Sequence, residues 1–323
     1  MTKEKNKIWV TRLFGIDIFV DYSWFWILSL IFVSFSFSLL PSLSPGKNIW
    51  EYIIFGMVGS FLFFGSILSH ELVHILVGRR SGIISNRITL FIFGGVSELS
   101  SEPANPRAEY LMAISGPLSS LVLALLLFGI SKLGGDIIFF KLINSLGMAN
   151  LFLGIFNLFP GFPLDGGRVL RAVIWGRTNN LLLATKIASN FGKGLAIFLA
   201  MIAVLQIFFL NFVSGVWLIL ISFFLYNLAH GSYFQALISF KLSQKTIKQV
   251  VYRNAEIMTT AAEIKGMNIS GLPSVDQDRP AIELFDIFAH SKENVVVMTS
   301  KNVPKAIISK EDLDHLIKDT LKN

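Results

Sequence analysis

The chain has 323 residues, of which 53% are hydrophobic and only 15% are charged, and its formal net charge is +7. Soluble proteins carry about 25% charged residues, so this composition indicates a membrane protein. Cysteine is absent, which excludes disulfides and thiolate ligands, so a bound transition metal must use His and carboxylate side chains. The positive charge is explained by basic residues in short cytoplasmic loops, and no nucleic-acid partner is expected.

Six apolar segments each approach the ~20 residues that cross a bilayer. We therefore expect an all-α multi-pass protein of a lipid bilayer, with its first span ending at Pro41 and its fourth interrupted. The expected spans are residues 24–40, 53–77, 110–133, 139 onward with a break at 156–167, 194–212 and 216–237, with a turn at 213–215. Basic residues precede the first span and follow the second, fourth and sixth, so the positive-inside rule places both termini in the cytoplasm.

The second span contains His70, Glu71 and His74. Residues four apart lie on one face of a helix, so the two imidazoles can bind one metal ion, and Glu71 can reach a water beside it. The alternative is a pair of histidines bonded to neighbouring backbone. Ionisable side chains are costly inside a membrane, and two of only five histidines flank a Glu at this spacing. We therefore expect one Zn²⁺ per chain, close to the cytosolic side.

Residues 88–93 and 96–99 read as two short strands around Gly94 and Gly95. This pattern predicts a small membrane-associated β-hairpin. Its free edge could hold an extended peptide by strand addition, which makes Gly94 and Gly95 candidate substrate-binding residues. The alternative is that the two glycines only form a turn.

The run from Asn157 to Arg168 reads NLFPGFPLDGGR, and its prolines and glycines break the fourth span. A broken helix is tolerated in a membrane only where it is buried in protein or lines a cavity. Asp165 is therefore the best candidate for a third metal ligand, although it could instead be a turn or helix N-cap residue. Asn157 could hold the substrate backbone or a developing oxyanion, or it could satisfy backbone groups at the break.

Together these segments resemble the site-2 protease family of intramembrane zinc metalloproteases. The resemblance covers about residues 12–235 and rests on four segments: His70–His74, Phe93–Gly95, Gly116–Leu118 and Asn157–Arg168. It implies that His70, His74 and Asp165 are zinc ligands and that Glu71 is the catalytic carboxylate, taking a proton from a water that zinc activates. It also implies single-pass membrane proteins as substrates, cut in regulated intramembrane proteolysis. Separately, we expect the membrane to be a prokaryotic cell membrane.

Two other functions remain as alternatives. A metal or proton transporter also places ionisable residues inside the membrane, but the two halves of this sequence show no inverted repeat. A scaffold that binds substrates without cutting them would not need the intact Glu71.

Beyond about residue 240 the composition becomes that of a soluble protein. We expect a transmembrane metalloprotease domain at 1–240 and a small α/β cytoplasmic regulatory or docking domain at 241–323. Strands at 295–298 and 303–308, followed by a helix that opens at 309–312, resemble half of a cystathionine-beta-synthase (CBS) domain pair. That resemblance implies an adenine nucleotide as a ligand, whereas a dimerisation module is the simpler alternative.

Overall fold

The computed structural model describes residues 7–83, 85–91, 94–99, 103, 105–135, 137–251, 272–290, 295–300 and 303–309. The chain folds into two compact units, Met1–His230 and Gly231–Asn323. The elements of the first unit are β1 (Lys7–Leu13), β2 (Ile16–Asp21), α1 (Tyr22–Ser34), η1 (Phe35–Leu39), α2 (Leu40–Leu43), α3 (Ile49–Arg80), β3 (Ser85–Phe91), β4 (Gly94–Leu99), α4 (Pro106–Ser131), α5 (Ile138–Asn157), α6 (Asp165–Thr178) and α7 (Leu181–Phe209). Helix α8 (Phe212–Ser243) begins in this unit and ends in the second.

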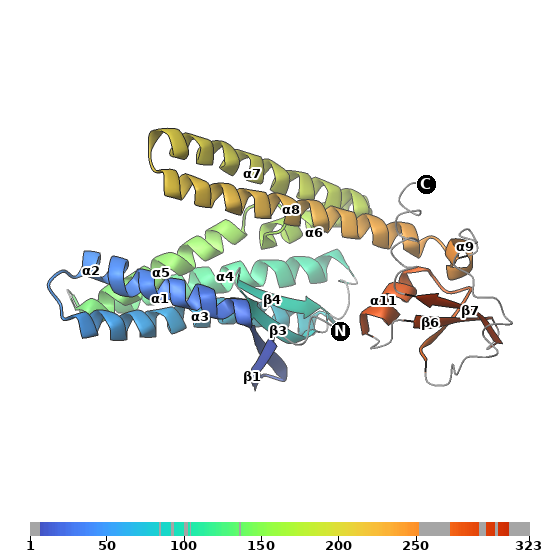
Figure 1. The fold of residues 1–323 in the computed structure, drawn as a ribbon, viewed down its shortest axis with the longest axis horizontal. Helices are drawn as coiled ribbons and strands as arrows, with labels where there is room; N and C mark the ends of the chain where they lie inside the picture. Colours follow the sequence, from blue (N-terminus) through green and yellow to red (C-terminus); the bar gives the residue numbers. More distant parts are fainter. Residues whose placement is uncertain are drawn as a thin grey trace. The chain divides into compact units, whose positions relative to one another are not determined.

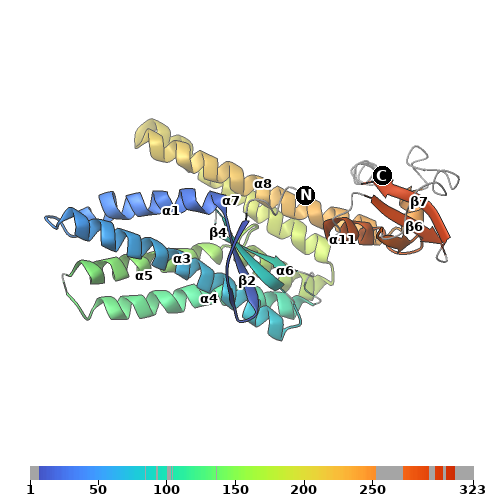
Figure 2. The ribbon, with the colours of Figure 1, turned by 60° about the horizontal axis from the view of Figure 1, so that its bottom comes forward.

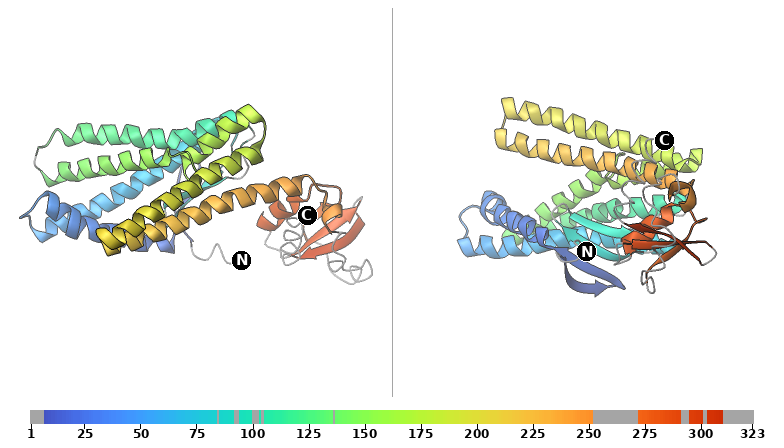
Figure 3. Two further views of the ribbon diagram at one scale, coloured as in Figure 1. Left: turned by 90° about the horizontal axis from the view of Figure 1, so that it is seen from above. Right: turned by 45° about the vertical axis from the view of Figure 1, so that its right-hand side comes forward.

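Six helical segments within the described residues are long and apolar enough to cross a membrane, which confirms the predicted number of spans. They are Tyr22–Leu43, α3, α4, α5, α7 and α8. Helices α3, α4 and α5 run alongside one another (Figure 1). Helices α7 and α8 form a long antiparallel pair (Figure 3).

Two predicted boundaries are wrong. The first span does not end at Pro41, because a π-type segment, in which the N–H of Leu40 bonds to the carbonyl of Phe35, carries the helix on to Leu43. Pro41 then lies in the first turn of α2, where a missing N–H costs little. The turn predicted at 213–215 lies inside α8, and the chain reverses earlier, between Phe209 and Phe212.

The predicted hairpin is confirmed as β3 and β4, but it is half of a larger sheet with the strand order β1-β2-β3-β4. Strand β2 pairs with β3 in parallel, and β4 is an edge strand of the sheet. On β2, Ile16, Ile18 and Val20 are buried and alternate with more exposed residues, and Ile16 and Val20 pack into a core with residues of α1 and α3. The strands run across the direction of the helices (Figure 2). Phe93 of the predicted hairpin lies outside the described residues.

The break after α5 brings the chain back against α7. Helix α5 ends at Asn157, and α6 begins at Asp165 after an irregular loop. Within that loop, the N–H of Phe162 donates to the carbonyl of Ala188 on α7 at 3.1 Å. A Cβ at Gly166 would lie 2.3 Å from the carbonyl oxygens of Leu158 and Phe159. Glycine therefore allows the loop to fold back onto the start of α6, which fixes where α6 begins.

In its described residues, the second unit contains a small sheet and two short helices, which contribute to an apolar core of its own. Besides the end of α8, its described elements are α9 (Ile247–Val251), β5 (Ser274–Asp276), α11 (Ile282–His290), β6 (Val295–Ser300) and β7 (Val303–Ser309). The strand order is β5-β6-β7, with β5 and β6 parallel and β6 and β7 antiparallel. The two strands predicted at 295–298 and 303–308 are confirmed. Of the predicted helix start, Ser309 is the last residue of β7, and residues 310–312 lie outside the described part of the chain.

Candidate metal centre

His70 and His74 lie on the face of α3 that packs against α4, and both are buried. The Nδ1 of His74 lies 2.6 Å from the carbonyl oxygen of Met112 on α4. Because a carbonyl can only accept a hydrogen bond, the proton is on Nδ1, which leaves the Nε2 lone pair free for a metal. The Nδ1 of His70 lies 2.9 Å from the Ser120 hydroxyl, which can accept in the same way. Helix α4 thus orients both imidazoles.

Asp165 is the first residue of α6, and its carboxylate points to the two histidines. Leu164 occupies the N-cap position, and no side chain caps the helix there. The Oδ2 of Asp165 lies 3.0 Å from Nε2 of His70 and 3.1 Å from Nε2 of His74. Burial raises the pKa of the Asp165 carboxyl group, but the two neighbouring imidazoles lower it by more, so that this pKa lies well below its usual range. The group is therefore an ionised carboxylate at neutral pH.

The three side chains fit a metal ion of the size of zinc. The two Nε2 atoms lie 3.1 Å apart, so the three donor atoms form a nearly equilateral triangle, and all potential ligand atoms of the group lie within 4.8 Å of one another. Tetrahedral zinc with bonds of about 2.0–2.2 Å separates its ligand atoms by about 3.3–3.6 Å. A small outward movement of the three side chains would reach that spacing. Two imidazoles and one carboxylate are also a donor set that zinc prefers.

Gly116 on α4 leaves the space in which the two imidazoles meet. A Cβ at this position would lie 2.1 Å from Nε2 of His74 and 2.7 Å from Nε2 of His70. The imidazoles cannot move aside without losing their contacts with Met112 and Ser120. In the sequence analysis Gly116 was only one of the residues that carry the family resemblance. The structure shows that the absence of a side chain at this position leaves room for the two imidazoles.

We expect Gly116→Ala to reduce bound metal to below a tenth of the wild-type content, because the added methyl group overlaps both Nε2 atoms. The measurement is zinc per folded chain in the purified protein. Gly129→Ala is the matched control, since it lies on the same helix and its Cβ would meet nothing within 4 Å. Equal metal content in the two variants would contradict the packing argument.

Glu71 is brought next to the hairpin. It follows His70 on α3, and it interacts electrostatically with His74, Asp165 and Arg168. A Cβ at Gly95 would lie 2.6 Å from the Cγ of Glu71, so the backbone of β4 passes directly beside this carboxylate. Gly94 has a φ of 125°, which favours glycine. The structure therefore brings together the His70–His74 segment and the β3–β4 hairpin, which were considered separately in the sequence analysis.

Asn157 is the last residue of α5, at the start of the break. Its side chain is half-buried and makes no hydrogen bond within the described residues. In the described structure it does not satisfy the backbone groups of the break.

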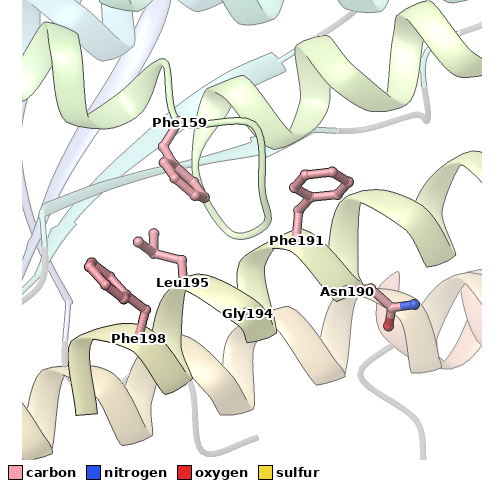
Figure 4. Close-up of a pocket in the computed structure, with 6 residues that line it drawn as sticks. All are labelled: Phe159, Asn190, Phe191, Gly194, Leu195 and Phe198. Atoms are coloured by element: carbon pink, nitrogen blue, oxygen red, sulfur yellow. The ribbon is translucent and has the colours of Figure 1, made fainter. Parts of the chain in front are cut away.

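An apolar groove lies beside this break, between the loop and α7. Figure 4 shows Phe159 reaching from the loop toward Leu195. The groove has a volume of about 550 Å³, and its lining residues are Phe159, Asn190, Phe191, Gly194, Leu195 and Phe198. Asn190 is the only polar side chain among them. Such a lining suits an apolar chain.

Sequence reasoning missed the contribution of α4. Glu109, Met112, Gly116 and Ser120 lie three or four residues apart, so they form one stripe along the helix. Two of them are polar residues that are completely or almost completely buried in an apolar span, Glu109 at 0% exposure and Ser120 at 1%. Polar residues at helical spacing within a membrane span were the available signal.

Comparison with known proteins agrees with this geometry. The model of peptidase family M50 matches residues 58–136 and 135–202. A protein of Synechocystis that is named as a candidate zinc metalloprotease is 38% identical over 266 residues, which cover 80% of this chain and 68% of the relative. The chain belongs to peptidase family M50. The expectation of a membrane metalloprotease is thereby confirmed.

Other members of the family agree. A candidate zinc metalloprotease of Mycobacterium tuberculosis is 33% identical over 229 residues, which are 70% of this chain and 58% of that protein. The structure of the site-2 protease from Methanocaldococcus jannaschii is similar, with a TM-score of 0.50 and 32% identity over 70% of this chain and 95% of that chain. The chain spans between about half and two thirds of the length of the curated relatives it matches.

Proposed function

We propose that this metalloprotease is an intramembrane zinc endopeptidase that cuts transmembrane segments of single-pass membrane proteins. One observation carries the proposal. Two Nε2 atoms of α3 and one carboxylate oxygen of α6 meet 3.0–3.1 Å apart inside an apolar helical bundle, beside the Glu71 carboxylate. Ionisable groups gathered in this way in a membrane protein require a function.

In this proposal His70, His74 and Asp165 hold one Zn²⁺ per chain, which leaves one position for a reacting group. Bound zinc supplies Lewis-acid chemistry, because it lowers the pKa of water and polarises a peptide carbonyl. Glu71 acts as the general base that removes a proton from the attacking water. It then donates that proton to the amine nitrogen that leaves when the peptide bond breaks. Met112 and Ser120 keep the Nδ1 atoms protonated throughout.

The edge of β4 is the proposed holding surface for substrate. A peptide bond within a helix is not available for attack until its helix unwinds, and an extended segment can then pair with an edge strand. Gly95 lies on that edge beside Glu71, and Gly94 precedes it at the start of the strand. Asn157 lies at the start of the break and would hold a substrate backbone group or the developing oxyanion. The apolar groove beside Phe159 has a lining that suits the adjoining apolar residues of such a segment.

We also propose an orientation and a role for the tail. Arg79 and Arg80 end α3, and the positive-inside rule places this end, together with both termini, in the cytoplasm of a prokaryotic cell. Residues 1–240 form the protease domain. Residues 241–323 form a regulatory or docking domain that contains the β6–β7 hairpin. The resemblance of its sequence to half of a CBS pair suggests an adenine nucleotide or a second copy of the chain as its partner.

The proposal is tested with purified protein in liposomes together with a tagged single-pass membrane protein. We expect cleavage within the transmembrane segment, loss of at least nine tenths of the rate with a zinc chelator, and recovery when zinc is added. A soluble unfolded protein added outside the vesicles serves as the control and should stay intact. Zinc or proton flux without any cleavage would instead support a transporter, and substrate capture without either would support a scaffold.

A further inference from the structure

We propose that Glu109 is a positioning residue that keeps Arg168 and Arg171 away from the Asp165 carboxylate, so that this carboxylate stays available to a metal. The inference rests on the ligand set of the proposed function. Glu109 lies in the first turn of α4 and is completely buried. An isolated buried carboxylate is very unfavourable, so its partners must be identified.

Those partners are both on α6. The Nε of Arg171 donates to Oε1 of Glu109 at 2.7 Å, and a second guanidinium nitrogen donates to the same oxygen. The Nε of Arg168 lies 3.9 Å from that oxygen. One carboxylate therefore serves two guanidinium groups, and both of these side chains are largely buried.

The position of Asp165 explains why these ion pairs matter for metal binding. Asp165, Arg168 and Arg171 follow one another at intervals of three residues, so they lie on one side of α6. An Asp and an Arg three residues apart on a helix readily form an ion pair. Arg168 already interacts electrostatically with Asp165. Without a competing carboxylate, Arg168 would be free to bind the oxygen that now contacts His70 and His74.

Two further contacts show that the cluster of Glu109, Arg168 and Arg171 also helps to hold α6 in place. The guanidinium of Arg171 lies over the Phe162 ring, 5.2 Å from its centroid. Phe162 belongs to the loop that leads into Asp165 and is bonded to α7. Glu109 stands three residues before Met112 on the same stripe of α4 that orients His74. This stripe of α4 thus orients His74 through the carbonyl of Met112. Through the carboxylate of Glu109 it keeps Arg168 away from Asp165.

The experiment measures the dissociation constant of zinc for the purified full chain by competition with a chelator. We expect Glu109→Gln to weaken zinc binding about 10- to 100-fold, the range seen when groups that support metal ligands are removed. The double variant Glu109→Gln/Arg168→Gln removes the competing cation and should recover to within about threefold of wild type. A merely structural role of Glu109 does not predict this rescue.

Asn150→Ala is the matched control. Asn150 is also a buried polar residue that joins two helices, since its Nδ2 donates to Ser66 of α3 at 3.0 Å, but it touches no residue of α6 by any described hydrogen bond. It should lower the melting temperature and leave the zinc dissociation constant unchanged. If Glu109→Gln behaves like this control, the inference is wrong.

Two additional variants keep the outcome decisive. Asp165→Ala must weaken zinc binding in the same titration, and if it does not, the proposed ligand set itself fails. If Asp165→Ala weakens binding but Glu109→Gln does not, only the inference about Glu109 fails. If Glu109→Gln does not fold, Glu109→Asp replaces it, because this change retracts the carboxylate by one methylene and should also weaken zinc binding. Rescue of that weaker binding by Arg168→Gln would support the inference, and lack of rescue would contradict it.

Discussion

Replacing Glu71 by Gln is expected to lower the turnover number for substrate cleavage by about 10²- to 10⁴-fold, the usual contribution of general acid–base catalysis. The amide keeps the size of the side chain and its place beside Gly95. It cannot accept a proton from water or return one to the leaving amine. Zinc content should stay at the wild-type level, because the three clustered donor atoms come from other residues. The measurement is the cleavage rate in liposomes, with zinc per chain determined on the same sample.

Glu51→Gln is the control for this prediction. Glu51 lies on the same helix but at its other end, where its carboxylate accepts from the N–H of Asn48 in a capping box. A Gln there can still accept that hydrogen bond, so cleavage should be unchanged. Cleavage by Glu71→Gln at the wild-type rate would refute the proposed role of Glu71. Loss of zinc in that variant would assign Glu71 to metal binding.

Some parts of the site could be predicted from the sequence, and others could not. His70 and His74 are linked by a local period of the helix, so their common face could be predicted. Asp165 lies far away along the chain, yet the broken span indicated it, because irregular backbone is tolerated inside a membrane only where it is buried in protein or lines a cavity. Both predictions used rules that depend only on neighbouring residues.

Contacts between distant segments could not be predicted in this way. Strand β2 pairs with β3, about 70 residues later in the chain, and only the alternation of Ile16, Ile18 and Val20 hinted at a strand. The support that Met112 gives to His74 comes from a backbone carbonyl, which any residue could supply. The spacing of Glu109 on α4 was visible in the sequence, but its role can be inferred only once its burial and its two arginine partners are known. The sequence pattern predicts which residues could bind the metal, whereas tertiary packing determines what orients them.

Replacing Asp165 by Ala is expected to reduce bound zinc to below a tenth of one per chain and to abolish cleavage. Two imidazoles remain, and a catalytic zinc site normally requires three protein ligands. The change also removes the negative charge that faces Arg168 and both histidines, so the pocket would attract a divalent cation less strongly. Zinc per chain and the cleavage rate should fall together.

The stability of this variant separates ligand loss from unfolding. Asp165 caps no helix with its side chain, so without zinc the melting temperature should change little relative to metal-free wild type. With zinc present, wild type should gain stability through binding and Asp165→Ala should not. Asp17→Asn is the control, since Asp17 pairs with Arg12 on the sheet and should leave zinc binding and zinc-dependent stability intact. Zinc-dependent stabilisation of Asp165→Ala equal to that of wild type would exclude Asp165 as a ligand, and with it the three-ligand site on which the proposed hydrolysis depends.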